Sequence, residues 1–327
     1  MNETEAGFAW QAFNLNWLPV ASMGAVLLGV IACTDFSLEP AAFGATIAIA
    51  LSLTLIAYGS AFTFPDPKLI FWFGSTAQVI AVTAIVGPLS YVTNALDWPL
   101  QDHTLLLMDR AIGLDPQSIA GFVNDHSWLV NYLNKGYGLI KWPLLGIPIV
   151  LTMTLRLIRL QQFVLALSIA LAVTIVISMC APAIGTYYGL NLSPAKVFPL
   201  LDSTNYAAQL RDIMALRNGS LRHLELYKLA GIVSFPSFHT ASAVLYGWAL
   251  WPVPGFRWAT TGISAWIIIA TPVIGAHYMV DLVGGAVVAV GSVFLAGWLL
   301  QMLASRNTRD VADSLSVGTV LRYETSR

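Results

Sequence analysis

The chain carries very little charge for its length. Only 10% of its 327 residues are Asp, Glu, Lys or Arg, whereas roughly a quarter of a soluble domain is charged. The formal net charge is −1, so there is no basic excess of the kind that binds nucleic acid. Because 57% of the residues are hydrophobic, the composition excludes an ordinary soluble domain and indicates an integral membrane protein.

Cysteine is also scarce. Cys33 and Cys180 lie far apart in separate apolar runs, which excludes a disulfide framework and a cysteine-rich zinc site. The first ten residues, MNETEAGFAW, include acidic residues but no Lys or Arg. They therefore lack the basic region of a cleavable signal peptide, and we expect the first apolar helix to direct membrane insertion.

Long apolar runs dominate what is present. A helix needs about 20 predominantly apolar residues to cross a bilayer, and on that basis the chain has about eight candidate spans. They are 17–34, 41–64, 69–95, 139–157, 163–183, 232–251, 258–276 and 278–303. The predicted fold class is therefore all-α, a polytopic helical bundle in the membrane.

Basic residues in short loops predict the orientation of the bundle. The short loops after the fourth and sixth spans, and the segment after the last span, contain Arg156, Arg159, Arg257, Arg306 and Arg309. These segments belong on the cytoplasmic side. The two long connections, 97–137 and 185–231, then lie outside, and the first of them has the mixed pattern of helices in the membrane interface.

Two histidines lie at the outer ends of predicted spans. His239 is in SFPSFHTASA, residues 234–243, and His277 is in GAHYMVDLVGG. If the sixth and seventh spans form an antiparallel hairpin, both histidines lie at one membrane level. Asp281 follows His277 by four residues, a spacing that puts both on one helix face. The carboxylate can then orient one imidazole nitrogen and leave the other free.

Two histidines with one carboxylate suit phosphoryl transfer. One imidazole attacks phosphorus, and the other protonates the departing oxygen. The helix start near Ser237 can help to bind the phosphate, since a helix N-terminus favours anions. Among the cations just upstream, Arg217 and Lys228 are the predicted phosphate-binding side chains.

The same residues resemble a known family. FPSFHTA and GAHYMVDLVGG are similar to the second and third motifs of the type 2 phosphatidic acid phosphatase superfamily, P-S-G-H and S-R-x5-H-x3-D. With Phe238 in place of the motif glycine, they look most like its inositol phosphorylceramide synthase (inositolphosphotransferase) branch. The resemblance covers 215–285, and more loosely 109–183.

The resemblance implies both an activity and the catalytic roles of the two histidines and the aspartate. Members have a six-helix core, need no metal or other cofactor, and act on phosphorylated lipids. His277 would be the nucleophile, Asp281 its orienting group and His239 the acid on the leaving group. We therefore expect a phosphoric ester hydrolase or a phospho-head-group transferase, with transfer favoured. The expected domains are a transmembrane hairpin (1–68), the catalytic membrane domain (69–304) and a polar cytoplasmic tail (305–327).

The chain also departs from the family pattern. Ala270 and Thr271 occupy the positions of the S-R pair, so an arginine of the third motif is missing. The first motif, K-x6-R-P, is matched only at 135–143, where Trp142 replaces the arginine. By its place in the topology, the segment APAIGTYYGL (181–190) corresponds to the first motif instead. It resembles the proline- and aromatic-rich segment that replaces this motif in the synthase branch.

Other interpretations stay open at this point. A transporter that uses His239, His277 and Asp281 as a proton relay is the alternative, although no inverted repeat is visible. The same three side chains also suit a zinc site with an open position.

We expect the protein to lie in the bacterial inner (plasma) membrane, with the site on the periplasmic or extracellular face; no oligomeric state is predicted. Asp109 and Asp115, in MDRAIGLDP, are interpreted as caps or turn residues.

Overall fold

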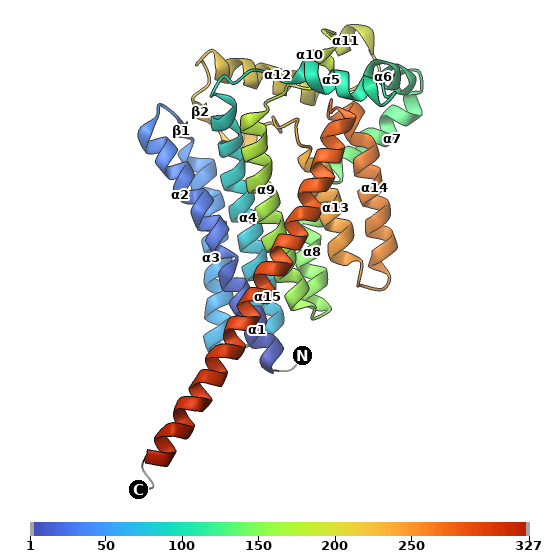
Figure 1. The fold of residues 1–327 in the computed structure, drawn as a ribbon. Coiled ribbons are helices and arrows are strands. Elements are labelled where there is room, and N and C mark those ends of the chain that lie inside the picture. The colour runs from blue at the N-terminus through green and yellow to red at the C-terminus, as the bar shows by residue number, and fades with distance from the viewer. Residues whose placement is uncertain (1–2, 325–327) are drawn as a thin grey trace.

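The protein is a helical bundle with a layer of shorter helices across one end, as the computed structural model of residues 3–324 shows (Figure 1). The bundle helices are α1 (Glu3–Leu15), α2 (Trp17–Cys33), α3 (Pro40–Thr63), α4 (Pro67–Asn94), α8 (Lys141–Met153), α9 (Leu157–Cys180), α13 (Phe238–Leu250), α14 (Phe256–Ile274) and α15 (Met279–Glu324). This confirms the predicted all-α, polytopic helical bundle.

The outer layer consists of the two long connections. Its elements are α5 (Asp102–Ala111), α6 (Pro116–Asn124), α7 (Ser127–Gly138), α10 (Thr186–Gly189), α11 (Pro194–Val197), α12 (Thr204–Arg217), β2 (His223–Leu224) and the 3₁₀ turn η1 (Leu226–Lys228). β2 pairs in parallel with β1 (Ser37–Leu38), which lies between α2 and α3. α1 and the C-terminal part of α15 lie at the opposite end of the bundle (Figure 1).

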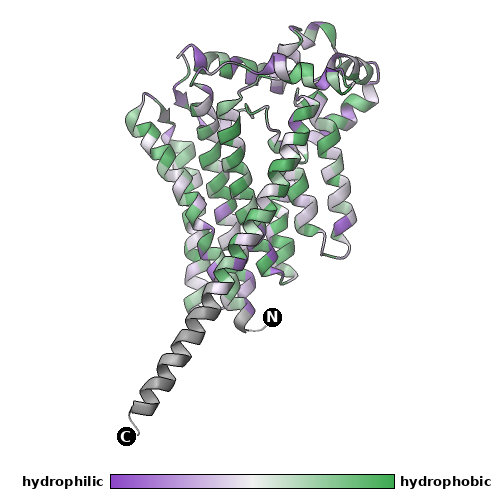
Figure 2. Ribbon diagram, viewed as in Figure 1, coloured by the Kyte–Doolittle hydropathy of each residue, from purple (hydrophilic) through white to green (hydrophobic). Residues whose placement is uncertain are grey.

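Fewer helices than predicted are long and apolar enough to cross a membrane alone. Five helical segments in the described chain meet that test. A sixth is added if α7 and α8, whose axes are bent by 47° relative to each other, form one span. The five are Glu5–Cys33, Pro40–Thr63, Pro67–Asn94, Leu157–Cys180 and Met279–Ser305. Hydrophobic residues dominate these helices, and hydrophilic ones are more frequent in the outer layer (Figure 2).

α13 is shorter than the span predicted over 232–251, and this shortening has a local cause. It has 13 residues and begins only at Phe238. Pro236 has no N–H to donate within a helix, and Ser237 accepts a hydrogen bond from Thr240 N as the N-cap. Residues 232–236 therefore form an irregular segment that enters the bundle before the helix starts.

α4 and α9 are the centre of the bundle, and α3 is at its edge. In the most apolar part of α9, 61% of residues are buried, and in α4 50%, against 17% in α3. α3 therefore has most of its surface free to face lipid. The polar segment after 304 continues α15 as a helix to Glu324, while 325–327 lie outside the described residues.

Candidate active site

His239 is placed by the start of α13. Ser237 is fully buried and caps the helix by accepting from Thr240 N at 3.3 Å. Its own N–H donates to the main-chain oxygen of Asp281 at 2.9 Å. The loop before α13 is thereby joined to the first turn of α15, and His239 lies one residue inside α13.

His277 lies in the turn between α14 and α15. Its Nδ1 is 3.1 Å from Oδ2 of Asp281, and only 4% of the His277 side chain is exposed. The predicted pair therefore forms, but not along one helix face: His277 precedes α15, and Asp281 is in its first turn. If the neutral ring donates from Nδ1, its Nε2 keeps a free lone pair.

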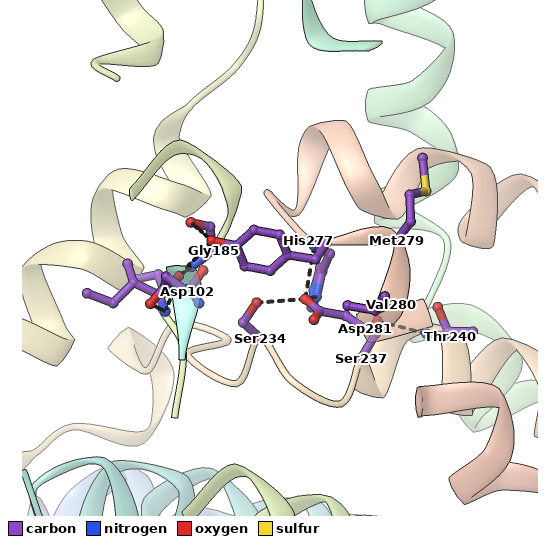
Figure 3. A network of polar contacts seen from close by, with 12 residues as sticks. Asp102, Gly185, Ser234, Ser237, Thr240, His277, Met279, Val280 and Asp281 are labelled. Atoms are coloured by element: carbon purple, nitrogen blue, oxygen red, sulfur yellow. Dashed lines mark hydrogen bonds and ion pairs between the residues drawn. The ribbon is translucent and has the colours of Figure 1, made fainter. Parts of the chain in front are cut away.

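The carboxylate of Asp281 is held from three directions. Besides His277, its Oδ2 accepts from Ser234 Oγ at 2.8 Å and from Tyr278 N at 3.0 Å. Figure 3 shows Asp281 between Ser234 and His277. Three donors on one oxygen fix the carboxylate, and the fixed carboxylate in turn orients the imidazole.

The two histidine rings are neighbours, as predicted. Their centroids are 6.1 Å apart with planes at 60°. The half-buried His239 also stacks on Tyr137 of α7, at 4.2 Å and 13°. Sequence reasoning missed Tyr137, because nothing in its surroundings along the chain indicates that α7 ends beside α13.

Two glycines allow α15 to approach the loop that carries His239. A Cβ at Gly285 would collide with the carbonyl of Ser237, and one at Gly284 would lie 3.2 Å from Pro236 Cβ. Gly284 and Gly285 therefore have a packing function: they let the two histidine segments touch.

Both rings face a cavity of about 220 Å³ among α4, α9, α12 and α13. Its apolar wall includes Val86, Leu171 and Ile175. Its polar lining, apart from the histidines and Tyr137, is neutral: Thr83, Ser90, Thr174, Asn205 and Gln209. An amphiphilic molecule matches such a lining, with its polar end near the histidines.

The predicted phosphate-binding cations are not brought to this cavity. Arg217 pairs with Asp97 at 2.9 Å and donates to the carbonyl of Trp98 at 2.7 Å. Lys228 pairs with Glu225 at 2.7 Å, and 75% of its side chain is exposed. Of the three predicted phosphate ligands, only Ser237 lies next to the histidines. The other two have partners in the outer layer.

Two more carboxylates surround the start of α15. Asp109 accepts from Met279 N at 2.8 Å and Val280 N at 3.0 Å, which confirms its interpretation as a cap. Asp102 accepts from Gly185 N at 2.7 Å and from the hydroxyl of Tyr278 at 3.0 Å. Burial raises the pKa of both carboxyls, and their backbone N–H donors oppose this rise.

The site is not arranged as a metal centre. In the described part of the chain, no group of three or more His, Cys, Asp or Glu side chains is placed to hold an ion. Oδ2 of Asp281 and Nδ1 of His277 are hydrogen-bonded to each other, so neither of these two atoms is left free to hold an ion. The zinc interpretation is therefore not supported by the donor geometry.

Comparison with known protein families assigns the chain to a family. No curated protein and no solved structure matches the chain. The family model described as the PAP2 superfamily matches residues 103–295, a segment that includes both histidines and Asp281. Members of this superfamily are phosphatases acting on phosphoric esters. Since the match covers more than half of the chain, the protein belongs to the PAP2 superfamily.

Proposed function

We propose that the protein is an integral-membrane lipid phosphatase or phosphotransferase that works through a phosphohistidine. The observation that carries this proposal is the buried His277–Asp281 pair with the ring of His239 6.1 Å from that of His277. At this separation both rings can contact one phosphate ester group. Membership of a phosphatase superfamily supports the same chemistry.

In the first step, Nε2 of His277 attacks phosphorus and the ester P–O bond breaks. His239, as imidazolium, gives its proton to the departing oxygen. Asp281 keeps its hydrogen bond to Nδ1, so the ring stays oriented as positive charge develops on it. In the second step, His239 removes a proton from the acceptor hydroxyl, whose oxygen attacks phosphorus as the P–N bond breaks.

The phosphate needs positive partners at this position. The imidazolium of His239 is one, and the N-terminus of α13 at Ser237 is another, because a helix N-terminus favours anions. Arg217 and Lys228 are held by acidic partners in the outer layer. We therefore assign phosphate binding mainly to the start of α13.

We favour transfer to a hydroxyl-bearing acceptor over hydrolysis. The resemblance to the inositol phosphorylceramide synthase branch supports this, as do Ser90, Asn205 and Gln209 in the cavity lining. Neutral amides and hydroxyls suit a transferred head group or an acceptor that has several hydroxyl groups. The basic residues in the short loops support a reaction on the periplasmic or extracellular face, and the membrane that we propose is a bacterial inner (plasma) membrane.

Purified protein in vesicles tests the proposal. Phosphatidic acid serves as substrate for hydrolysis, and phosphatidylinositol with ceramide serves for head-group transfer, each with and without a chelator. We expect turnover that survives the chelator and is lost in His239→Asn and His277→Asn. If no donor is consumed while the same vesicles couple solute uptake to a proton gradient, the proton-relay interpretation replaces this one.

A further inference from the structure

The turn that carries His277 has an unusual backbone. Ala276 has φ of +54°, in the left-handed region that non-glycine residues seldom adopt. The preceding α14 ends at Ile274 and α15 begins only at Met279. The direction of the His277 side chain therefore depends on contacts that hold this turn from outside.

One such contact comes from Asp109 on α5. Its carboxylate accepts both Met279 N and Val280 N, 170 and 171 positions further along the chain. Asp109 is fully buried. The first N–H groups of a helix usually find a partner close by in sequence. Here α5 of the outer layer satisfies them and so fixes where α15 begins.

A second contact comes from Asp102, seven residues earlier and therefore on the same face of α5. Its Oδ1 accepts from Gly185 N and from the Tyr278 hydroxyl, next to His277. The neighbouring Thr186 donates its N–H to the carbonyl of Ala276 at 2.8 Å. A Cβ at Gly185 would lie 2.5 Å from the same carbonyl oxygen, so the two turns pack closely.

We propose that Asp102 and Asp109 are positioning residues that clamp the His277 turn between them. Asp109 holds the residues after His277, and Asp102 holds the segment against which Ala276 packs. Neither carboxylate lines the cavity that His239 and His277 share. Asp109 and His277 line a second cavity of only about 10 Å³, which has room for no more than a water molecule. The clamp itself stands on the geometry of the turn, while its consequence for turnover rests on the proposed function.

Asp109→Asn is the most direct test, with Asp115→Asn as the matched control. Asp115 is also an aspartate that caps a helix, α6, by accepting from Ser118 N at 3.1 Å. It contacts Arg110 instead of the His277 turn. An asparagine offers only one acceptor oxygen, so one of the two N–H groups of α15 loses its partner.

Two measurements test the proposal: hydrogen exchange reports on the structure of the His277 turn, and turnover reports on the reaction. Hydrogen exchange of a peptide covering 275–283 should become at least about tenfold faster in Asp109→Asn and stay unchanged in Asp115→Asn. Turnover should fall about 10- to 100-fold with KM within about threefold, because a small displacement of a reacting group is costly. Asp102→Asn should give the same pattern, and it decides the matter if Asp109→Asn does not fold.

The outcomes are distinguishable. Unchanged exchange at 275–283, or unchanged turnover despite faster exchange, overturns the positioning function. If the wild type consumes none of the lipids, the proposed function fails, and the exchange experiment alone supports or overturns the clamp.

Discussion

Two buried polar groups in the bundle differ in chemistry. At the outer end, His277, Asp281 and Ser234 form a group with ionisable members, beside a cavity. The second group, called the inner group here, joins the α1–α2 junction to α9 and α4. In it, Asn16 donates to Gln161 Oε1 at 2.9 Å, and Gln161 donates to Ser75 Oγ at 3.1 Å. All members of the inner group are neutral and fully buried.

The difference indicates that the inner group serves helix packing and the outer group serves catalysis. Neutral groups that donate hydrogen bonds from the α1–α2 junction to α9, and from α9 to α4, hold helices together in a medium without water. A carboxylate and an imidazole are expensive to bury, and in a membrane protein they indicate function. Changes in the outer group should therefore alter catalysis, and changes in the inner group should alter stability.

The largest effect is expected from His277→Ala. Loss of the attacking nitrogen should lower turnover by about 10⁴-fold or more, because a nucleophile has no substitute. The melting temperature in detergent should stay close to that of the wild type. A variant that retained a tenth of wild-type turnover would remove His277 from the reaction.

Asp281→Asn should have the next largest effect. Ser234 Oγ and Tyr278 N also donate to this position, so the amide oxygen would still face Nδ1 of His277. A neutral amide stabilises the positive charge that develops on the ring less than a carboxylate does. We expect a loss of about 10²- to 10⁴-fold in turnover, with substrate affinity nearly constant. Steady-state kinetics on the vesicle assay measure both, and a change confined to KM would argue against an orienting carboxylate.

Gly285→Ala tests the contact between the two histidine segments. The added Cβ would meet the carbonyl of Ser237, so we expect a loss of about 1–3 kcal/mol in stability and reduced turnover. Gly291 is the control on the same helix, since its Cβ would meet nothing within 4 Å. There, alanine should stabilise α15 by up to about 1 kcal/mol. Equal thermal shifts for the two variants would contradict the close approach.

Gln161→Leu should show the opposite pattern to the histidine variants. It removes the partner of Asn16 and Ser75, and a hydrogen bond between membrane helices is worth about 0.6 to 1.7 kcal/mol. Thermal unfolding should shift downward while turnover per folded molecule stays within about twofold. Loss of turnover without loss of stability would break the distinction between the two groups.

The smallest effect is expected from Lys228→Ala. The Lys228 side chain is mostly exposed and paired with Glu225, and an exposed ion pair contributes little. KM should stay within about twofold of the wild-type value. A tenfold rise in KM would restore Lys228 as a phosphate ligand and show that the outer layer closes over the substrate.

The sequence predicts the parts of the site that depend on local spacing. His277 and Asp281 are four residues apart, and a short connection joins α13 to α14, so their meeting with His239 follows from local rules. Contacts across the bundle were not accessible in this way. Tyr137 and His239 come from α7 and α13, which are far apart in the chain, and their rings meet only in the folded bundle.

The cations show the same limit. Arg217 and Lys228 are near the histidine motif in sequence, but both lie in the outer layer, where they pair with Asp97 and Glu225. Nearness along the chain overestimated their nearness in space. Helix lengths were overestimated too, because Pro236 and Ser237 delay the start of α13 beyond the apolar run.

Detection of phosphate on the protein tests the central claim most directly. Wild-type protein is mixed with phosphorus-labelled lipid, quenched in alkali within the first turnovers, and digested for peptide mapping. The account predicts acid-labile, alkali-stable phosphate on His277, increased in His239→Asn if release becomes slower than attack. Label on another residue, or rapid turnover with no labelled protein at any time, would contradict it.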